Sequence, residues 1–116
     1  MAYRKRKLAI RKRDNAVEFV NGYEFDVCFS EGTLFSVGVF KSARKHNLWT
    51  VTDVNTGYAI CYGNSRVDAV RKFQQTYLHK LERMVFSNER YTPLKPENWY
   101  ETKTAEFAKL VEGVRS

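Results

Sequence analysis

The sequence predicts an α+β protein in which about five antiparallel strands come first and two helices follow. Three observations predict it. Apolar and polar residues alternate between residues 17 and 39, which is the period of strands with one buried face. A second strand-like pattern with a central turn occupies residues 48–63. An apolar stripe at helical spacing then runs from residue 67 to residue 84, so a long helix is expected to cover the sheet.

The first three strands are expected to form a β-meander. Their apolar residues all stand at odd positions, from Val17 to Val39. Three-residue loops at 20–22 and 30–32 each keep these side chains on one face of the sheet. In both loops the glycine takes the left-handed position, and the second loop sets Phe35 opposite Val27.

A hairpin is expected next, at residues 48–54 and 58–63. A four-residue loop at 54–57 aligns Trp49 with Tyr62 and turns Cys61 toward the other face. The hairpin thus predicts two further strands of the same sheet.

Two helices are expected to complete the domain. Ser65, with Asp68 three residues later, predicts the N-cap of a helix that extends to about residue 86. Its expected buried stripe consists of Val67, Val70, Phe73, Tyr77, Leu81 and Met84. A linker with two prolines follows at 87–97, and Asn98 begins a short final helix. That helix is expected to bury Phe107, Leu110, Val111 and Val114.

The net charge of +7 is concentrated at the N-terminus. The first 13 residues contain seven basic residues and no acidic one, whereas residues 14–116 contain 13 of each sign. Basic blocks of this kind are typical of tails that bind polyanions. We therefore expect an extended basic arm at 1–13 and a single α+β domain at 14–116 that folds without the arm.

The residue inventory predicts that the protein is not an enzyme. Neither the two histidines nor the two cysteines stand at metal-ligand spacing, and the sequence contains no nucleophile elbow and no phosphate-binding glycine loop. We expect no cofactor, no metal ion and no small-molecule substrate. Cys28 and Cys61 are expected to be reduced thiols. Because no apolar run reaches about 18 residues and no signal peptide is apparent, we expect a cytoplasmic protein without membrane contact.

The candidate binding residues for nucleic acid or a nucleic-acid-bearing partner are all basic. They come from the arm, from a polar turn, and from the two ends of the long helix. They are Arg4, Lys5, Arg6, Lys7, Arg11, Lys12, Arg13, Arg44, Lys45, Arg66, Lys72 and Arg83. Arginine outnumbers lysine in the arm, which favours forked contacts to phosphate. The aromatic residues Tyr23, Phe25 and Phe29 are expected in the core, because the apolar stripe of the long helix needs a surface to cover. A base-stacking platform on an open sheet face is the alternative.

Residues 58–73 (YAICYGNSRVDAVRKF) resemble the last strand and helix start of double-stranded-RNA-binding domains. Ser65 and Ala69 match that pattern and Arg66 takes the place of its first lysine, whereas Val67 and Asp68 depart from it. The order of strands and helix also resembles the arm-binding domains of phage integrases. Both resemblances imply direct binding of DNA or RNA.

The whole chain is similar to small accessory proteins of phages and mobile elements. The features concerned are the basic start, the aromatic α+β body and the hairpin W-x-V-T-D-x-x-T-G at residues 49–57. Anti-CRISPR inhibitors of type II RNA-guided nucleases belong to this class. The resemblance implies an inhibitor whose basic arm contacts guide RNA or occludes the nucleic-acid channel of the nuclease. A stand-alone DNA- or RNA-binding module is the alternative, and a structural or virion-associated role is a third.

Overall fold

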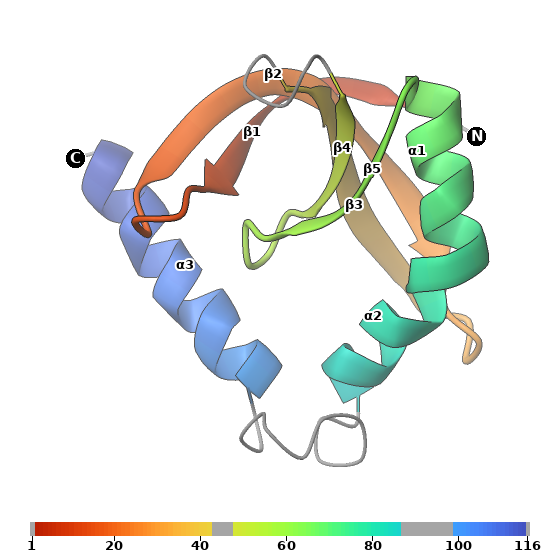
Figure 1. Cartoon of the computed structure of the whole chain (residues 1–116). Helices are drawn as coiled ribbons and strands as arrows, with labels where there is room; N and C mark the ends of the chain where they lie inside the picture. Colours follow the sequence, from red (N-terminus) through yellow and green to blue (C-terminus); the bar gives the residue numbers. More distant parts are fainter. Residues whose placement is uncertain (1, 43–47, 87–98, 116) are drawn as a thin grey trace.

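Five strands pair in the order of the chain to form one antiparallel sheet (Figure 1). The computed structural model describes residues 2–42, 48–86 and 99–115. The strands are β1 (Arg4–Arg11), β2 (Val17–Cys28), β3 (Leu34–Lys41), β4 (Trp49–Asp53) and β5 (Ala59–Gly63). The prediction of an α+β protein with a five-stranded antiparallel sheet is thus confirmed, although the strands are not all those expected.

The N-terminal basic segment is strand β1, so the prediction of an extended arm was wrong. β1 pairs with β2 along its whole length, from Arg4 opposite Glu24 to Arg11 opposite Val17. Leu8 secures this pairing, because its side chain is buried against the backbones of Gly22 and Gly38. A Cβ atom at those glycines would lie only 2.7 and 2.9 Å from Leu8 Cδ1. The two glycines therefore make the space that Leu8 fills.

The two predicted loops of the meander have different outcomes. β2 runs without a break through residues 20–22, where a turn was expected, because Gly22 lies in the strand opposite Arg6. The loop at 30–32 is confirmed. Gly32 has φ +95°, Phe35 lies opposite Val27, and the Phe29 amide donates to the Thr33 carbonyl at 2.9 Å.

The register of the second hairpin differs from the prediction by one residue. Trp49 lies opposite Gly63, and Val51 lies opposite Cys61, with an irregularity in the pairing after Val51. Cys61 therefore faces the core and is buried, and burial raises the pKa of its thiol to about 11. The hairpin turn ends at Gly57, which has φ +74°.

The long helix is continuous but is not α-helical throughout. It consists of α1 (Arg66–Lys72), the π-helical turn η1 (Phe73–Tyr77) and α2 (Leu78–Phe86). Ser65 is the N-cap as predicted, and its hydroxyl accepts from the Asp68 amide at 3.0 Å. Val67 was expected in the buried stripe but is 65% exposed. The close approach of Ala69 to Gly63 turns α1 so that Ala69, not Val67, faces the sheet.

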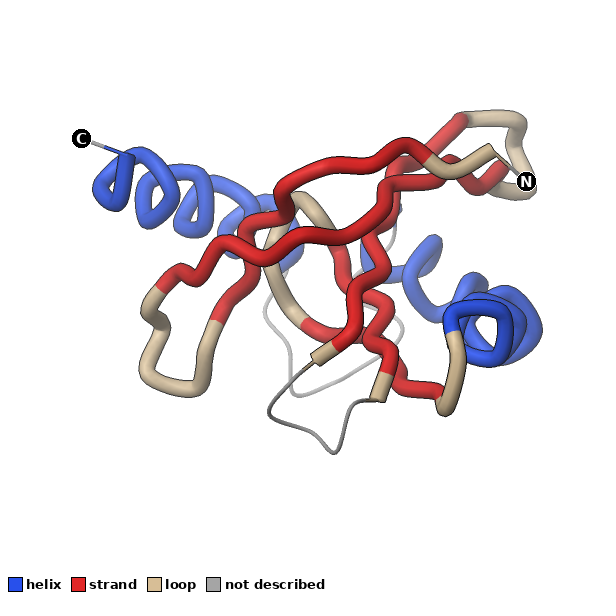
Figure 2. The backbone as a smooth tube through the Cα atoms, turned by 90° about the horizontal axis from the view of Figure 1, so that it is seen from above, coloured by secondary structure: helices blue, strands red, loops and turns tan. Residues whose placement is uncertain are grey.

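Helix α3 (Trp99–Arg115) has 17 residues and is longer than the short helix expected. It buries Tyr100 and Phe107, whereas Val114 is 53% exposed. The predicted linker at 87–97 and the cap at Asn98 lie outside the described residues. Figures 1 and 2 show a strongly twisted sheet that curves between α1 and α2 on one side and α3 on the other. The main core lies under α1 and η1, where Phe73 meets Phe25 edge to face.

Candidate nucleic-acid interface

Two of the predicted binding arginines hold β1 to β2. Side chains alternate along β1, so Arg4 and Arg6 lie on the face opposite that of the helices, beside acidic residues of β2. Arg4 donates to Glu24 at 2.7 Å and to Asp26 at 3.0 Å, and Arg6 forms an ion pair with Glu24. The hydrogen bonds from Arg4 and Ser36 lower the pKa of Asp26. Arg4 and Arg6 therefore have carboxylate partners within the protein.

Arg11 is buried, although the sequence gives no sign of it. Its side chain is 1% exposed. Nε donates to the Thr56 carbonyl at 3.1 Å, Nη1 donates to Glu106 at 2.6 Å, and the guanidinium carbon lies 4.4 Å from the centre of the Tyr58 ring. The hydrogen bond from Arg11 is the main cause of a lowered pKa at Glu106. Arg11 therefore joins β1 to the hairpin turn and to α3, and it does not face a partner.

The other four basic residues of the N-terminal segment form no ion pair with a described residue. Lys5 and Lys7 lie on the helix side of β1, opposite Tyr23 and Asn21 of β2. Lys12 and Arg13 lie at the far end, in the turn between β1 and β2. Lys5 and Lys7 are therefore the predicted residues of β1 that remain available to a polyanion.

Arg66 brings an aromatic cluster together beside Lys5. Its guanidinium carbon lies 4.5 Å from the centre of the Tyr3 ring and 4.8 Å from that of Tyr23. The Tyr23 ring stacks on Trp49 with centroids 6.5 Å apart. Trp49 in turn lies opposite Lys41 in the sheet, so their side chains share a face. We call this set the aromatic–basic corner: Tyr3, Lys5, Tyr23, Lys41, Trp49 and Arg66.

The aromatic–basic corner has the chemistry of a nucleic-acid site. Aromatic rings and guanidinium planes stack on bases, and lysine side chains neutralise phosphates. The three rings are half-buried, which fixes their positions but leaves part of each exposed. Lys5, Lys41 and Arg66 form no ion pair with a described residue. Aromatic rings and basic side chains therefore share one surface.

Sequence reasoning found only part of this corner. It named Lys5 and Arg66 but not Tyr3, Lys41 or Trp49, and it placed Tyr23 in the core. The alternation of apolar residues at odd positions begins at Val17 and does not extend through the N-terminal segment, so periodicity gave no signal for the corner.

The remaining predicted binding residues do not join the corner. Lys72 donates to the Tyr62 carbonyl at 2.9 Å, and Arg83 lies in the last turn of α2. Arg44 and Lys45 lie outside the described residues.

Within residues 2–42, 48–86 and 99–115, no three His, Cys, Asp or Glu side chains lie close enough to hold a metal ion. None of the helices in these ranges has the length and apolar character that a membrane span requires. Comparisons with protein-family models, with curated proteins and with solved structures found no match.

Proposed function

We propose that the protein binds nucleic acid through the aromatic–basic corner. The observation that carries the proposal is the placement of Arg66 over the rings of Tyr3 and Tyr23, next to lysines that form no ion pair with a described carboxylate. Isolated surface lysines usually serve solvation only. Here Lys5 and Lys41 flank three rings that contact one another, and base stacking on such rings contributes about 1–3 kcal/mol per base.

The partner that we propose is guide RNA, or the nucleic-acid channel, of an RNA-guided nuclease. This partner comes from the resemblance to anti-CRISPR proteins, and Lys5 and Lys7 of β1 supply the charge that it needs. Direct binding of cellular DNA or RNA would use the same corner. The two alternatives differ in what purifies with the protein from its host: a nuclease with its guide in one case, nucleic acid alone in the other.

The binding should weaken steeply as salt rises. Four phosphate contacts, by Lys5, Lys7, Lys41 and Arg66, give a log–log slope of about −3 for a single strand and about −3.6 for a duplex. Lys5→Glu should lower the affinity and flatten the slope by about 1. Trp49→Leu should weaken binding without changing the slope, because it removes stacking and no charge.

Lys109→Glu is the matched control, because Lys109 is exposed on α3, away from the corner. Point substitutions are preferable to deletion of residues 1–13, which would remove strand β1 from the sheet. Affinity is measured by fluorescence anisotropy with labelled RNA and DNA, and inhibition by cleavage assays with the loaded nuclease. Equal affinity and equal salt dependence in Lys5→Glu, Trp49→Leu and Lys109→Glu would show that the corner does not bind nucleic acid.

A further inference from the structure

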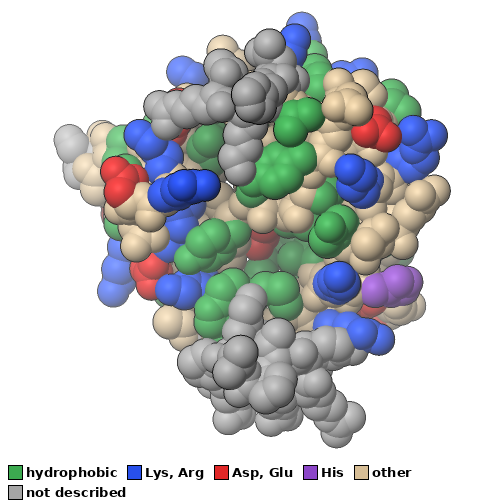
Figure 3. Space-filling view, viewed as in Figure 1, with side chains coloured by type: hydrophobic (Ala, Val, Ile, Leu, Met, Phe, Trp, Pro, Cys, Tyr) green, Lys and Arg blue, Asp and Glu red, His purple; other side chains and the backbone are tan. Residues whose placement is uncertain are grey.

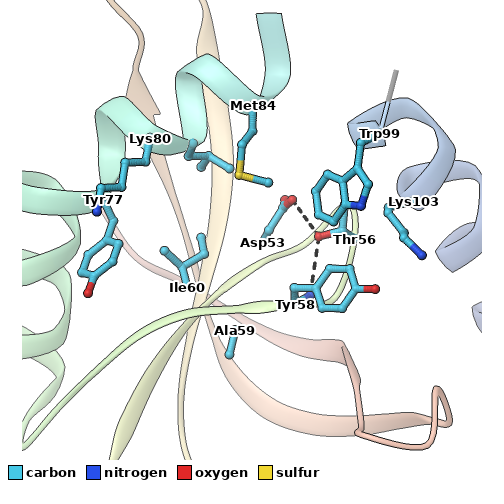
Figure 4. A pocket seen from close by; sticks show the side chains of 11 residues that line it. Asp53, Thr56, Tyr58, Ala59, Ile60, Tyr77, Lys80, Met84, Trp99 and Lys103 are labelled. Carbon is cyan, nitrogen blue, oxygen red and sulfur yellow. Dashed lines mark hydrogen bonds between the residues drawn. The ribbon is translucent and has the colours of Figure 1, made fainter. Parts of the chain in front are cut away.

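A cavity of about 510 Å³ opens between α2 and α3, above the β4–β5 hairpin. This volume lies in the range of small-molecule sites, about 300–1,000 Å³. Figure 3 shows a hollow bordered by hydrophobic side chains with an acidic group inside it, and the close view in Figure 4 shows Asp53 between Met84, Ile60 and Trp99. The cavity thus combines apolar walls with a single carboxylate.

Asp53 is a buried carboxylate that forms no ion pair within the described part of the chain. The residue is 3% exposed and is the last residue of β4, immediately before the β4–β5 turn. Its oxygens accept from Tyr100 Oη at 2.8 Å, Thr56 Oγ1 at 2.9 Å and the Asn55 amide at 3.1 Å. All three donors are neutral, and no lysine, arginine or histidine among the described residues forms an ion pair with Asp53. Burial raises the pKa of Asp53, against the lowering effect of these hydrogen bonds.

The carboxylate has room for one more donor. An ionised carboxylate offers about four acceptor positions, and the protein fills three of them. Because Asp53 lines the cavity, the remaining position is open to a ligand that enters there. A cationic donor would also supply the missing counter-charge, which neutral donors do not.

The walls of the cavity suit a cation on an apolar body. The rings of Tyr58 and Trp99 stack with centroids 6.0 Å apart, and the Arg11 guanidinium lies 4.4 Å from the centre of the Tyr58 ring. These rings therefore supply apolar wall, and Asp53 is the group that attracts the cation. The two lysines that line the cavity do not donate to the Asp53 carboxylate. Lys80 Nζ lies 5.2 Å from the centre of the Tyr77 ring, and Lys103 Nζ lies 3.5 Å from Glu106. Figure 4 shows both ammonium groups directed away from Asp53, at opposite ends of the cavity.

We infer that this cavity binds a small organic cation, a primary amine on an apolar or aromatic body, with the ammonium group donating to Asp53. The body would lie against Ile60, Met84 and Trp99. The same chemistry is available from a free amine or from a lysine side chain of a peptide. The inference is independent of nucleic-acid binding, because none of these residues belongs to the aromatic–basic corner.

Three probes with one body and different charge test the inference: phenylbutylamine, phenylbutanol and phenylbutyrate. Titration calorimetry and amide chemical shifts should show that the amine binds at least about tenfold more tightly than the alcohol or the acid. Asp53→Asn keeps the shape of the side chain and removes its charge, so it should abolish this preference. Glu112→Gln, on the exposed face of α3, should leave it unchanged.

Two further variants keep the test decisive if Asp53→Asn fails to fold. Met84→Trp fills part of the cavity and leaves Asp53 and its three donors in the sequence, so it should block amine binding. Lys80→Gln removes a positive charge that would repel the ammonium group, so it should tighten amine binding roughly severalfold. If the cavity bound an anion instead, the same change would weaken binding.

A peptide experiment distinguishes a free amine from a lysine side chain as the ligand. It compares a short peptide that has one lysine with the same peptide acetylated at that lysine. Preference for the unmodified peptide, with or without binding of the free amine, supports a lysine side chain as ligand. Binding of the free amine alone supports a small molecule. Equal binding of the three probes, binding of neither amine nor peptide, or amine binding that survives both Asp53→Asn and Met84→Trp would overturn the inference.

Discussion

Replacing Arg11 with methionine should test whether this residue ties β1 to α3. The substitution removes the hydrogen bond to the Thr56 carbonyl, the ion pair with Glu106, and the contact with the Tyr58 ring. Methionine retains much of the apolar stem, so the loss reports on the guanidinium and not on an empty cavity. The side chain is 1% exposed, so water cannot replace these contacts at Arg11.

The expected cost follows from these contacts. Hydrogen bonds from a charged group contribute about 1.5–3 kcal/mol each, and a cation over an aromatic ring contributes about 0.5–2 kcal/mol. Part of this free energy is regained in the variant. The buried guanidinium no longer has to be desolvated, and methionine packs well in the space. We therefore expect the free energy of unfolding to fall by about 2–4 kcal/mol, which lowers the melting temperature of a domain of this size by about 8–16 °C.

Arg13→Met is the matched control, since it removes the same charge from an exposed position two residues away. It should change the free energy of unfolding by less than about 0.5 kcal/mol. Arg11→Lys should fall between the two, because one ammonium group cannot reach Thr56 and Glu106 as the guanidinium does. Thermal unfolding followed by circular dichroism provides the measurement. If Arg11→Met melts within about 2 °C of Arg13→Met, the tie between β1 and α3 does not contribute to stability.

Two more predictions concern stability. Gly57→Ala should destabilise the protein more than Gly32→Ala. Alanine in the left-handed backbone conformation of Gly32 costs about 1–2 kcal/mol, and this is the whole of the expected effect there. A Cβ at Gly57 would also lie 2.4 Å from the Phe107 ring, whereas one at Gly32 meets no atom within 4 Å; equal losses in urea unfolding would contradict this packing. The pKa values of Glu106 and Asp26 are lowered in the folded state, chiefly by hydrogen bonds from Arg11 and Arg4. Their stabilising contribution is therefore complete above the ordinary values of 4.5 and 3.8 and is lost as pH falls through the folded-state values. Glu106→Gln should reduce the fall in melting temperature between about pH 6 and about pH 3, and an unchanged fall would rule out this role.

Local signals in the sequence predicted the elements whose causes are local. The Ser65 cap depends on Asp68, three residues away, and the loop at 30–32 depends on the backbone freedom of Gly32. In both cases the decisive partner lies within the same few residues. Such features can be inferred from spacing alone.

Strand β1 could not be predicted in this way, because its causes are distant in the sequence. Arg4 finds its carboxylates about twenty residues away on β2, and Leu8 fills a space left by Gly22 and Gly38. Without those partners, seven basic residues in 13 indicate a solvated tail. The prediction that residues 14–116 fold without the segment before them has lost its basis, because Leu8 and Arg11 are both buried.

The candidate site shows the same division between local and distant causes. The charge of the N-terminal segment was evident from composition, but nothing local distinguishes Arg11 from Arg13. Burial of Arg11 depends on Tyr58 and Glu106, which only the fold brings near. Of the three rings of the corner, only Tyr23 was expected in the core. Periodicity shows which face of a strand a residue is on, but it does not show where the covering helix ends.

The tie between Arg11 and Glu106 also constrains the order in which the chain can fold. The two residues are 95 positions apart, so this contact cannot form until the first half of α3, up to Glu106, has been synthesised. Contacts of such long range are slow to close and are made late. On the ribosome, the emerging sheet would hold an unpaired guanidinium beside Tyr58 until the last helix arrives, and α3 would complete the domain as its final element.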